Sequence, residues 1–245
     1  MRFFKMNGLG NDYIFIDEKQ FSGEAPKLNI PFLCDRHKGV GSDGVVLFRE
    51  IGKNTLSMKI FNVDGTEAEM CGNALRCLIR HVGAIGKEIT VHTKAGVKTG
   101  SFNGITVSIN LGKPVSYDTK LRNIVINGKI YCGKRVNVGN PHFVIEKPYD
   151  DKLARSISEC TAFFPSRTNV EFVTKTYDGY NARVYERGCG ETLACGTGAA
   201  AVLIASGKAE TNVHLSGGTL VCKIEKEDII QIGTAEYNFE GEINV

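Results

Sequence analysis

Hydrophobic residues recur along the chain with two different periods, which predict strands and helices respectively. Alternation with a period of two, from Leu56 to Ile60 and again from Ile105 to Leu111, predicts half-buried strands. Apolar residues spaced three and four apart between Leu75 and Val82 predict an amphipathic helix. A run of small and apolar residues over Ala199–Ser206 predicts a second helix.

Turn-forming residues predict where these segments end. Gly86 is placed to close the first helix, and Gly207 to close the second. Short apolar runs bounded by glycine, asparagine or aspartate predict further strands at 3–6, 13–16, 45–48, 123–138, 143–145, 170–173 and 183–185, and short helices are expected at 31–34 and 152–158. One main helix per half among many hairpin strands favours an α+β fold over a doubly wound sheet.

Several of these patterns occur twice in the same order. Cys71-Gly72 and Cys195-Gly196 each precede a predicted main helix, and Asn62 and Glu186 each lie nine positions before their cysteine. Matching segments upstream and downstream are separated by similar offsets, so we infer an ancient internal duplication. The duplication predicts two pseudo-symmetric domains, residues 1–113 plus 236–245 and residues 114–235, with the last segment, 237–245, returning to the first half as a strand.

Composition fits a packed globular protein and excludes several other classes. The chain has 245 residues, 42% of them hydrophobic, and a formal net charge of +3, which gives no argument for binding nucleic acid or an anionic membrane. No apolar run approaches the roughly 18 residues that span a bilayer, and the amino terminus lacks the apolar core of a signal peptide. We therefore expect a cytoplasmic protein.

The eight cysteines are expected to be reduced thiols rather than disulfides or metal ligands. Two pairs of cysteines are six residues apart, which is longer than the ligand spacing of structural zinc sites. We expect no metal. Six of the eight are expected to pack as small hydrophobic residues or to lie at the surface, namely Cys34, Cys77, Cys132, Cys160, Cys189 and Cys222.

The remaining two cysteines carry the candidate chemistry. A thiol at a helix start meets unpaired backbone N–H groups and the positive end of the helix dipole, so it is expected to ionise more easily than a free cysteine. Two equivalent thiols, Cys71 and Cys195, suit the inversion of a carbon stereocentre, because one can remove a proton from one face while the other donates to the opposite face. The N–H groups at Gly72-Asn73 and Gly196-Thr197 could stabilise charge on the adjacent carboxylate.

Three further residues are candidates for tuning the thiols and binding the substrate. His142 could accept a thiol proton, Glu186 could keep one thiol protonated, and Arg187 could hold a second carboxylate. The alternatives are a core or turn histidine and a surface ion pair. The duplication aligns His142 with Tyr13, so a histidine is expected only in the second half.

Taken together, these motifs resemble the diaminopimelate epimerase family. The similar stretches occur in family order and span almost the whole chain: Gly8-Leu9-Gly10-Asn11-Asp12, Arg36 to Gly44, Asn62-Val63-Asp64-Gly65 with Cys71-Gly72-Asn73, Gly139-Asn140-Pro141-His142, Thr168-Asn169-Val170-Glu171-Phe172, and Tyr185-Glu186-Arg187-Gly188 with Ala194-Cys195-Gly196-Thr197-Gly198. Each tetrapeptide alone is weak evidence, whereas all six together are specific.

The resemblance implies a function and a set of site residues. It implies a cofactor-independent enzyme that interconverts LL- and meso-2,6-diaminopimelate on the way to lysine and peptidoglycan precursors, usually as a homodimer, in two α+β domains that each wrap a curved, mostly antiparallel sheet around a central helix. Cys71 and Cys195 match the acid/base pair, and His142 and Glu186 match residues that modulate it. Substrate contacts are implied for Asn11, Asn62, Asn140, Asn169, Glu186 and Arg187, and a carboxylate cradle for Gly72, Asn73, Gly196 and Thr197.

The chain also departs from the pattern of the family that it resembles, and other functions stay open. It is shorter than most members between Pro114 and Asn140, and it has Gly44 where some members have a glutamine that contacts substrate. One alternative is another two-thiol racemase or epimerase, similar to proline racemase or hydroxyproline epimerase. Others are a relative that has lost the chemistry, as in phenazine biosynthesis, and a redox sensor that uses Cys71 and Cys195.

Overall fold

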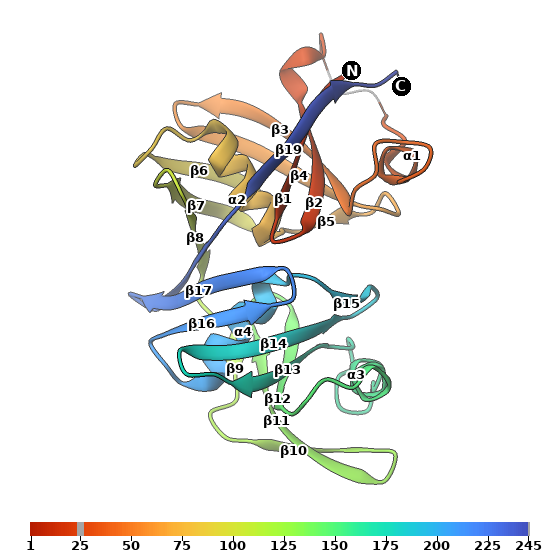
Figure 1. The fold of residues 1–245 in the computed structure, drawn as a ribbon, viewed down its shortest axis with the longest axis vertical. Coiled ribbons are helices and arrows are strands. Elements are labelled where there is room, and N and C mark those ends of the chain that lie inside the picture. The colour runs from red at the N-terminus through yellow and green to blue at the C-terminus, as the bar shows by residue number, and fades with distance from the viewer. Residues whose placement is uncertain (24–26, 245) are drawn as a thin grey trace. The chain divides into compact units, whose positions relative to one another are not determined.

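The protein, described here from a computed structural model over residues 1–23 and 27–244, is divided into two compact units (Figure 1). Unit 1 comprises Met1–Asn110 and Gly233–Val245, and unit 2 comprises Leu111–Ile232. Each unit is an α+β structure with a mostly antiparallel sheet and one long helix, as predicted. Among the described helices, none is both long enough and apolar enough to cross a membrane.

In unit 1 the strands follow the order β19–β1–β2–β3–β4–β6–β7–β8, and the short β5 pairs with β4. The steps β2–β3 and β4–β6 are parallel and the others are antiparallel. The strands are β1 Arg2–Gly8, β2 Asn11–Asp17, β3 Gly44–Gly52, β4 Thr55–Asn62, β5 Glu67–Ala68, β6 Glu88–Thr93, β7 Gly96–Phe102, β8 Val107–Gly112 and β19 Glu236–Glu242; a 3-10 turn, η1, covers Glu18–Gln20.

Both parallel steps of unit 1 are bridged by a helix, because parallel strands need a crossover connection. The short α1 (Ile30–Cys34) lies between β2 and β3, and α2 (Gly72–Val82) lies between β4 and β6. The α2 helix packs on β1, β2 and β7, and its residues from Gly72 to Ile79 are buried. The sheet therefore surrounds α2 as the central helix of this unit.

Unit 2 repeats this arrangement strand for strand, with the order β11–β12–β13–β14–β16–β17–β18 and parallel steps at β12–β13 and β14–β16. Here β9 and β10 pair with β11, and β15 pairs with β14. The elements are β9 Ser116–Tyr117, β10 Arg122–Ile126, β11 Lys129–Asn137, β12 Pro141–Glu146, α3 Asp151–Ser158, β13 Asn169–Lys175, β14 Gly179–Glu186, β15 Gly190–Thr192, α4 Gly196–Ser206, β16 Glu210–Leu215, β17 Gly218–Glu225 and β18 Asp228–Gly233.

Strand register confirms the internal duplication. Ile60 pairs with Ala68 in unit 1, and Val184 pairs with Thr192 in unit 2, so both partners are displaced by 124 residues (184 − 60 and 192 − 68). Across the first parallel step, Tyr13 lies opposite Gly44, and the equivalent pair in unit 2 joins His142 and Asn169. The strand register therefore confirms the predicted alignment of Tyr13 with His142.

The two central helices end differently. Gly207 closes α4 in the left-handed conformation with φ 70°, as predicted. The prediction that Gly86 closes α2 is wrong, because the helix stops at Val82 and the Gly83 N–H bonds to the Ile79 carbonyl at 2.8 Å. A Cβ on Gly83 would come within 2.5 Å of that carbonyl oxygen, so a glycine is needed there. Gly86 instead occupies a later turn with φ 74°.

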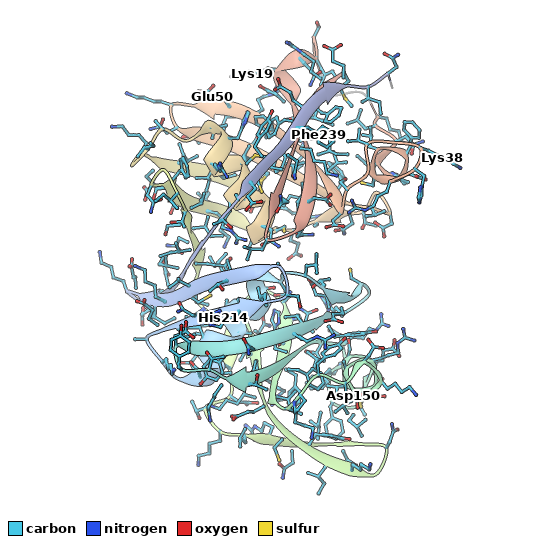
Figure 2. All side chains as sticks on the ribbon, in the orientation of Figure 1. Lys19, Lys38, Glu50, Asp150, His214 and Phe239 are labelled. Atoms are coloured by element: carbon cyan, nitrogen blue, oxygen red, sulfur yellow. The ribbon has the colours of Figure 1, made fainter. Side chains whose placement is uncertain are left out.

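The carboxyl-terminal strand completes unit 1. β19 pairs antiparallel with β1, which confirms that the last segment returns to the first half; Val245 lies outside the described residues. Phe239, labelled on this strand in Figure 2, meets the Phe3 ring edge-on with centroids 6.1 Å apart. In unit 2, Asp150, also labelled there, caps α3 by accepting the Leu153 N–H at 3.1 Å.

Candidate active site

In unit 1 the candidate site is built where Cys71 precedes α2. Cys71 has an extended backbone, and its carbonyl accepts the Leu75 N–H at 2.9 Å, so it is the residue on which the helix begins. Gly8 on β1 allows the close approach of this helix start, because a Cβ at Gly8 would lie 3.0–3.1 Å from Asn73 atoms. The Cys71 thiol is half-buried. The first N–H groups of α2 follow directly, and such groups have no partner within the helix itself.

Two side chains of β2 contact the Cys71 sulfur. The Tyr13 phenol donates to Sγ at 3.1 Å, and the Cys71 thiol donates to Asn11 Oδ1 at 3.8 Å. The Asn11 amide is held at its other end by Asp43, to whose carboxylate it donates at 2.9 Å. The strand β2 therefore presents a phenol and a fixed amide to the thiol.

A buried polar network supports the start of α2. Asn73 donates to Asn11 Oδ1 at 3.0 Å, and the Arg76 guanidinium donates to Asn73 Oδ1 at 2.6 Å. Arg76 is completely buried. Because these bonds fix both ends of the Asn73 amide, the residue is held rigidly beside Cys71. Asn62, by contrast, lies exposed at the end of β4 and donates to Thr66 at 3.0 Å.

An ionic network fixes the start of β2, where Asn11 lies. The Asp12 carboxylate receives two hydrogen bonds from the Arg36 guanidinium, at 2.8 and 3.0 Å, and lies 2.7 Å from Lys5 Nζ. Burial alone would raise the pKa of Asp12, but Arg36 and Lys5 outweigh burial and lower the pKa from 3.8 to about 2. Asp12 therefore stays ionised and anchors the tip of the β1–β2 hairpin.

In unit 2, Cys195 occupies the equivalent place before α4 but has different surroundings. Its sulfur accepts the Gly198 N–H at 3.3 Å and lies 3.4 Å from the Thr197 hydroxyl. Only 4% of the residue is exposed. Burial, followed by the negative charges of Glu186 and Glu171, raises the pKa of this thiol well above its usual value. The prediction that a helix start lowers the thiol pKa is therefore wrong for Cys195, because burial and two carboxylates outweigh the helix dipole.

A buried histidine–glutamate pair lies beside this thiol. His142 Nδ1 is 2.6 Å from Glu171 Oε1, and the two side chains are fully buried. A contact this short between a ring nitrogen and a carboxyl oxygen needs one shared proton. Burial raises the pKa of Glu171 although the His142 ring acts in the opposite direction. A Cβ on Gly198 would lie 3.0 Å from Glu171 Oε1 and 3.3 Å from Cys195 Sγ, so the carboxyl group and the thiol flank the same glycine.

Glu171 was not among the predicted site residues. Within the Thr168–Phe172 motif it stands in an apolar strand segment, Val170-Glu171-Phe172-Val173. A carboxylate in a run that predicts a buried strand is the sequence signal that could have found it, since such groups are rarely buried without a partner. Its Oε2 has no hydrogen-bond partner among the described residues.

The other predicted residues of unit 2 form a chain of hydrogen bonds. Asn140 Oδ1 accepts from His142 Nε2 at 2.9 Å, and the Asn140 amide nitrogen donates to the Thr197 hydroxyl at 3.2 Å. Asn169 accepts the Arg187 N–H at 2.9 Å, and its amide nitrogen lies 3.5 Å from His142 Nε2. A chain of contacts therefore runs from Cys195 through Thr197 and Asn140 to His142, and joins four of the predicted residues of this half.

Glu186 and Arg187 lie at the end of β14. Glu186 accepts the Thr192 hydroxyl at 2.6 Å, and the exposed Arg187 guanidinium donates to the Ser166 carbonyl at 2.7 Å. Val170 pairs with Tyr185 across the antiparallel pair β13–β14, so the same register places Asn169 opposite Glu186. An acidic residue and a basic residue therefore follow one another at this edge of unit 2.

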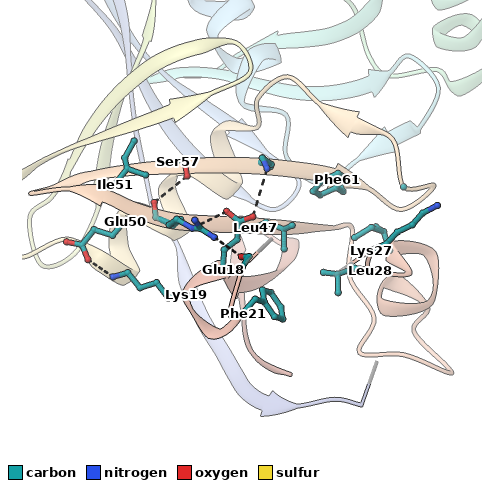
Figure 3. Close-up of a pocket in the computed structure, with 15 residues that line it drawn as sticks. Glu18, Lys19, Phe21, Lys27, Leu28, Leu47, Glu50, Ile51, Ser57 and Phe61 are labelled. Carbon is teal, nitrogen blue, oxygen red and sulfur yellow. Dashed lines mark hydrogen bonds and ion pairs between the residues drawn. The ribbon is translucent and has the colours of Figure 1, made fainter. Parts of the chain in front are cut away.

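A large cavity among the described residues lies elsewhere. This open hollow of about 1220 Å³ in unit 1 is formed by β3, β4, η1 and the segment before α1 (Figure 3). Glu18, Lys19, Leu47 and Glu50 are among its lining residues, whereas none of the predicted site residues lines it. We therefore do not assign the chemistry to it.

Comparison with known proteins decides the family. The sequence profile described as "Diaminopimelate epimerase" matches residues 3–116 and 135–239. The chain belongs to the diaminopimelate epimerase family. It is 40% identical to a diaminopimelate epimerase of Methanococcus maripaludis, over 100% of both chains. It is 36% identical to that of Brachyspira hyodysenteriae, over 100% of this chain and 99% of the relative.

Solved structures show that the fold extends beyond the family. A probable proline racemase from Agrobacterium radiobacter K84 has a TM-score of 0.73 at 14% identity, covering 100% of this chain and 93% of the racemase. At that identity the likeness concerns the fold alone. The family resemblance and the fold class inferred from the sequence are thus confirmed.

Proposed function

We propose that this chain is a cofactor-independent epimerase that interconverts LL- and meso-2,6-diaminopimelate, in lysine and peptidoglycan precursor biosynthesis. The observation that carries the proposal is the repeated placement of a cysteine at the start of each central helix, Cys71 before α2 and Cys195 before α4. Family membership over nearly the whole chain supports the substrate.

The proposed reaction balances with two thiols and no other proton carrier. One thiolate takes the α-proton and becomes a thiol, and the electron pair of the broken C–H bond spreads onto the adjacent carboxylate. The second thiol then donates its proton to the opposite face of the carbon and becomes a thiolate. N–H groups at the helix starts, at Gly72-Asn73 and Gly196-Thr197, would stabilise the charge on the carboxylate.

The two half-sites favour different resting protonation states. Cys195 is buried near Glu186 and Glu171, which disfavours its thiolate. In the proposed resting enzyme Cys195 therefore carries the proton. Cys71 is half-buried and receives a phenol hydrogen bond, so it is assigned as the resting base. His142 and Glu186 modulate the Cys195 side of the site.

To bind the distal amino-acid end of the substrate, the site needs a cation for the carboxylate and an anion or amide oxygens for the ammonium. Glu186 and the exposed Arg187 are adjacent residues of opposite charge, which suits the binding of an ammonium and a carboxylate. Four amide side chains are proposed as further contacts: Asn11, Asn62, Asn140 and Asn169. This charged end argues against proline as the substrate.

The deciding experiment follows solvent hydrogen into the product. Incubation of LL-diaminopimelate with the enzyme in D2O should place deuterium at the inverted α-carbon, detectable by mass spectrometry. Cys71→Ala and Cys195→Ala should each lower turnover by about 10³-fold or more while circular dichroism shows an intact fold, because each variant lacks one acid/base group. Cys132→Ala, which removes an exposed thiol of unit 2, is the matched control and should keep native activity.

Two outcomes would refute the proposal. Substantial turnover by either single variant would contradict a two-thiol mechanism. Racemisation of proline together with no reaction of diaminopimelate would favour the proline-racemase-like alternative.

A homodimeric, cytoplasmic enzyme is also part of the proposal and rests on the family resemblance. Sedimentation velocity of the purified chain tests the dimer.

A further inference from the structure

Tyr13 brings a phenol to the Cys71 sulfur. Its O–H donates to Sγ at 3.1 Å, and only 7% of the residue is exposed. The ring is held edge-on by Phe15 on the same strand, with centroids 6.5 Å apart. A buried ring with a single polar tip has few alternative positions, so the hydroxyl is fixed at the sulfur.

Gly44 makes room for this ring. Tyr13 pairs with Gly44 across the parallel step from β2 to β3. A Cβ at Gly44 would lie 2.8 Å from Tyr13 Cε1 and 2.6 Å from the Phe61 carbonyl oxygen. Gly44 has an ordinary backbone conformation, so space rather than a positive φ requires the glycine. Tyr13 and Gly44 therefore form a coupled pair.

The other half of the duplication shows how differently the same position is used. His142 replaces Tyr13 in unit 2, and two steps along the register Glu171 replaces Val46. His142 is turned to the Glu171 carboxyl group at 2.6 Å. In unit 1 the fully buried Val46 stands where unit 2 has that carboxyl group. The Tyr13 phenol is directed to the Cys71 thiol instead.

We propose that Tyr13 is a further catalytic residue, whose phenol hydrogen bond stabilises the Cys71 thiolate and aims its sulfur for proton transfer. The phenol keeps its own proton throughout, and only the sulfur gains and loses one. Charge-assisted hydrogen bonds to an anion are stronger than neutral ones, so the bond favours the ionised sulfur over the thiol. The role in turnover rests on the proposed function, whereas the effect on the thiol does not.

Several other charged or titratable groups lie on the elements around Cys71. On β2 they are Asp12 and Asp17, and on α2 they are Arg76, the buried Cys77, Arg80 and His81. Asp43 reaches the same network through Asn11, and Glu67 and Glu69 precede the cysteine along the chain. Removal of the phenol oxygen alone leaves all of these groups in place.

The test therefore compares the native enzyme with Tyr13→Phe, which deletes one oxygen atom and keeps the ring. The rate of Cys71 alkylation by iodoacetamide is measured against pH and resolved by peptide mass spectrometry, because only the thiolate reacts. The exposed Cys132 serves as the internal reference for the reagent. Tyr237→Phe, which removes a phenol that bonds to Glu240 at 2.9 Å, is the matched control in the same unit.

We expect the midpoint of Cys71 alkylation to rise by about one to two pH units in Tyr13→Phe, with no change in Tyr237→Phe. Superimposable Cys71 curves for the native enzyme and Tyr13→Phe would overturn the proposal, as would an equal shift in Tyr237→Phe. Thiolate absorbance in the ultraviolet, titrated in the native enzyme and in Cys71→Ala, gives the native midpoint independently. Circular dichroism establishes that Tyr13→Phe is folded.

A turnover measurement separates this proposal from the function on which it partly rests. If the enzyme epimerises diaminopimelate, Tyr13→Phe should lower kcat by about tenfold or more and change KM little, because the bond acts on the reacting sulfur. A shifted alkylation curve in an enzyme that does not act on diaminopimelate would sustain the role of Tyr13 and refute the substrate. An unshifted alkylation curve for Tyr13→Phe in an enzyme that epimerises diaminopimelate would refute the role of Tyr13 and sustain the substrate.

Discussion

At the scale of single residues, the two half-sites differ in the charge around their cysteines. Cys195 faces carboxylates in a buried setting, whereas Cys71 accepts a phenol hydrogen bond in a half-buried one. An enzyme that inverts a centre with two thiols needs one of them ionised and the other protonated at the start of each turnover. In the proposed mechanism, the unequal surroundings would supply that difference, although the two cysteines occupy equivalent places before their helices.

The pKa of Asp12 makes the hairpin tip sensitive to acid. A carboxylate whose pKa falls from 3.8 to about 2 on folding contributes stability that is complete above pH 3.8 and is lost as the pH falls through 2. After discounting for partial solvent exposure, we expect the native enzyme to exceed Asp12→Asn by about 1–2 kcal/mol in free energy of unfolding near pH 6. Urea titrations followed by circular dichroism should show this difference shrinking toward zero near pH 2.

Glu50→Gln is the control for this comparison, since Glu50 forms an exposed ion pair with Lys19 at 2.7 Å. Exposed pairs contribute little, so its difference from the native enzyme should stay small at both pH values. A difference between native enzyme and Asp12→Asn that persisted unchanged at pH 2 would show that the carboxylate charge is not what stabilises the hairpin.

At the scale of elements, close approach between β1 and α2 positions Cys71. We expect Gly8→Ala to lower the free energy of unfolding by about 1–3 kcal/mol, because its Cβ would press on Asn73 backbone atoms at 3.1 Å. Gly52→Ala is the matched control, since its Cβ would meet only Thr55 atoms at 3.6 Å or more. Equal free energies of unfolding of the two variants in urea titrations would argue that α2 can move away from residue 8 without a loss of stability.

Local signals explain which elements could be predicted from the sequence. The starts of α2 and α4 and the end of α4 at Gly207 follow from patterns within a few residues. The end of α2 was missed because Gly83 is required by contact with Ile79, whereas Gly86 offers the same local signal three residues later. The Tyr13–Gly44 pair and the Glu171–His142 pair depend on strand register, which no short motif encodes.

At the scale of the whole molecule, duplication explains why one strand comes from the far end of the chain. In unit 2, β11 is flanked on its outer side by the neighbouring strands β9 and β10. In unit 1, the equivalent β1 is flanked by β19, from Arg2 opposite Glu242 to Asn7 opposite Glu236. Unit 1 is therefore completed only when the last strand has been made.

Truncation after Ala235 tests this dependence. Without β19, β1 becomes an edge strand and the Phe3–Phe239 ring contact is lost, so amides of β1 and β2 should lose protection from hydrogen exchange by about tenfold or more. Amides of β12 and β13 in unit 2 serve as the internal control and should keep their native protection, because all their strand partners remain. Mass spectrometry of peptic fragments resolves the two sets. Equal loss of protection in both units would mean that the chain unfolds as one cooperative body, and native protection of β1 would mean that β19 is dispensable for unit 1.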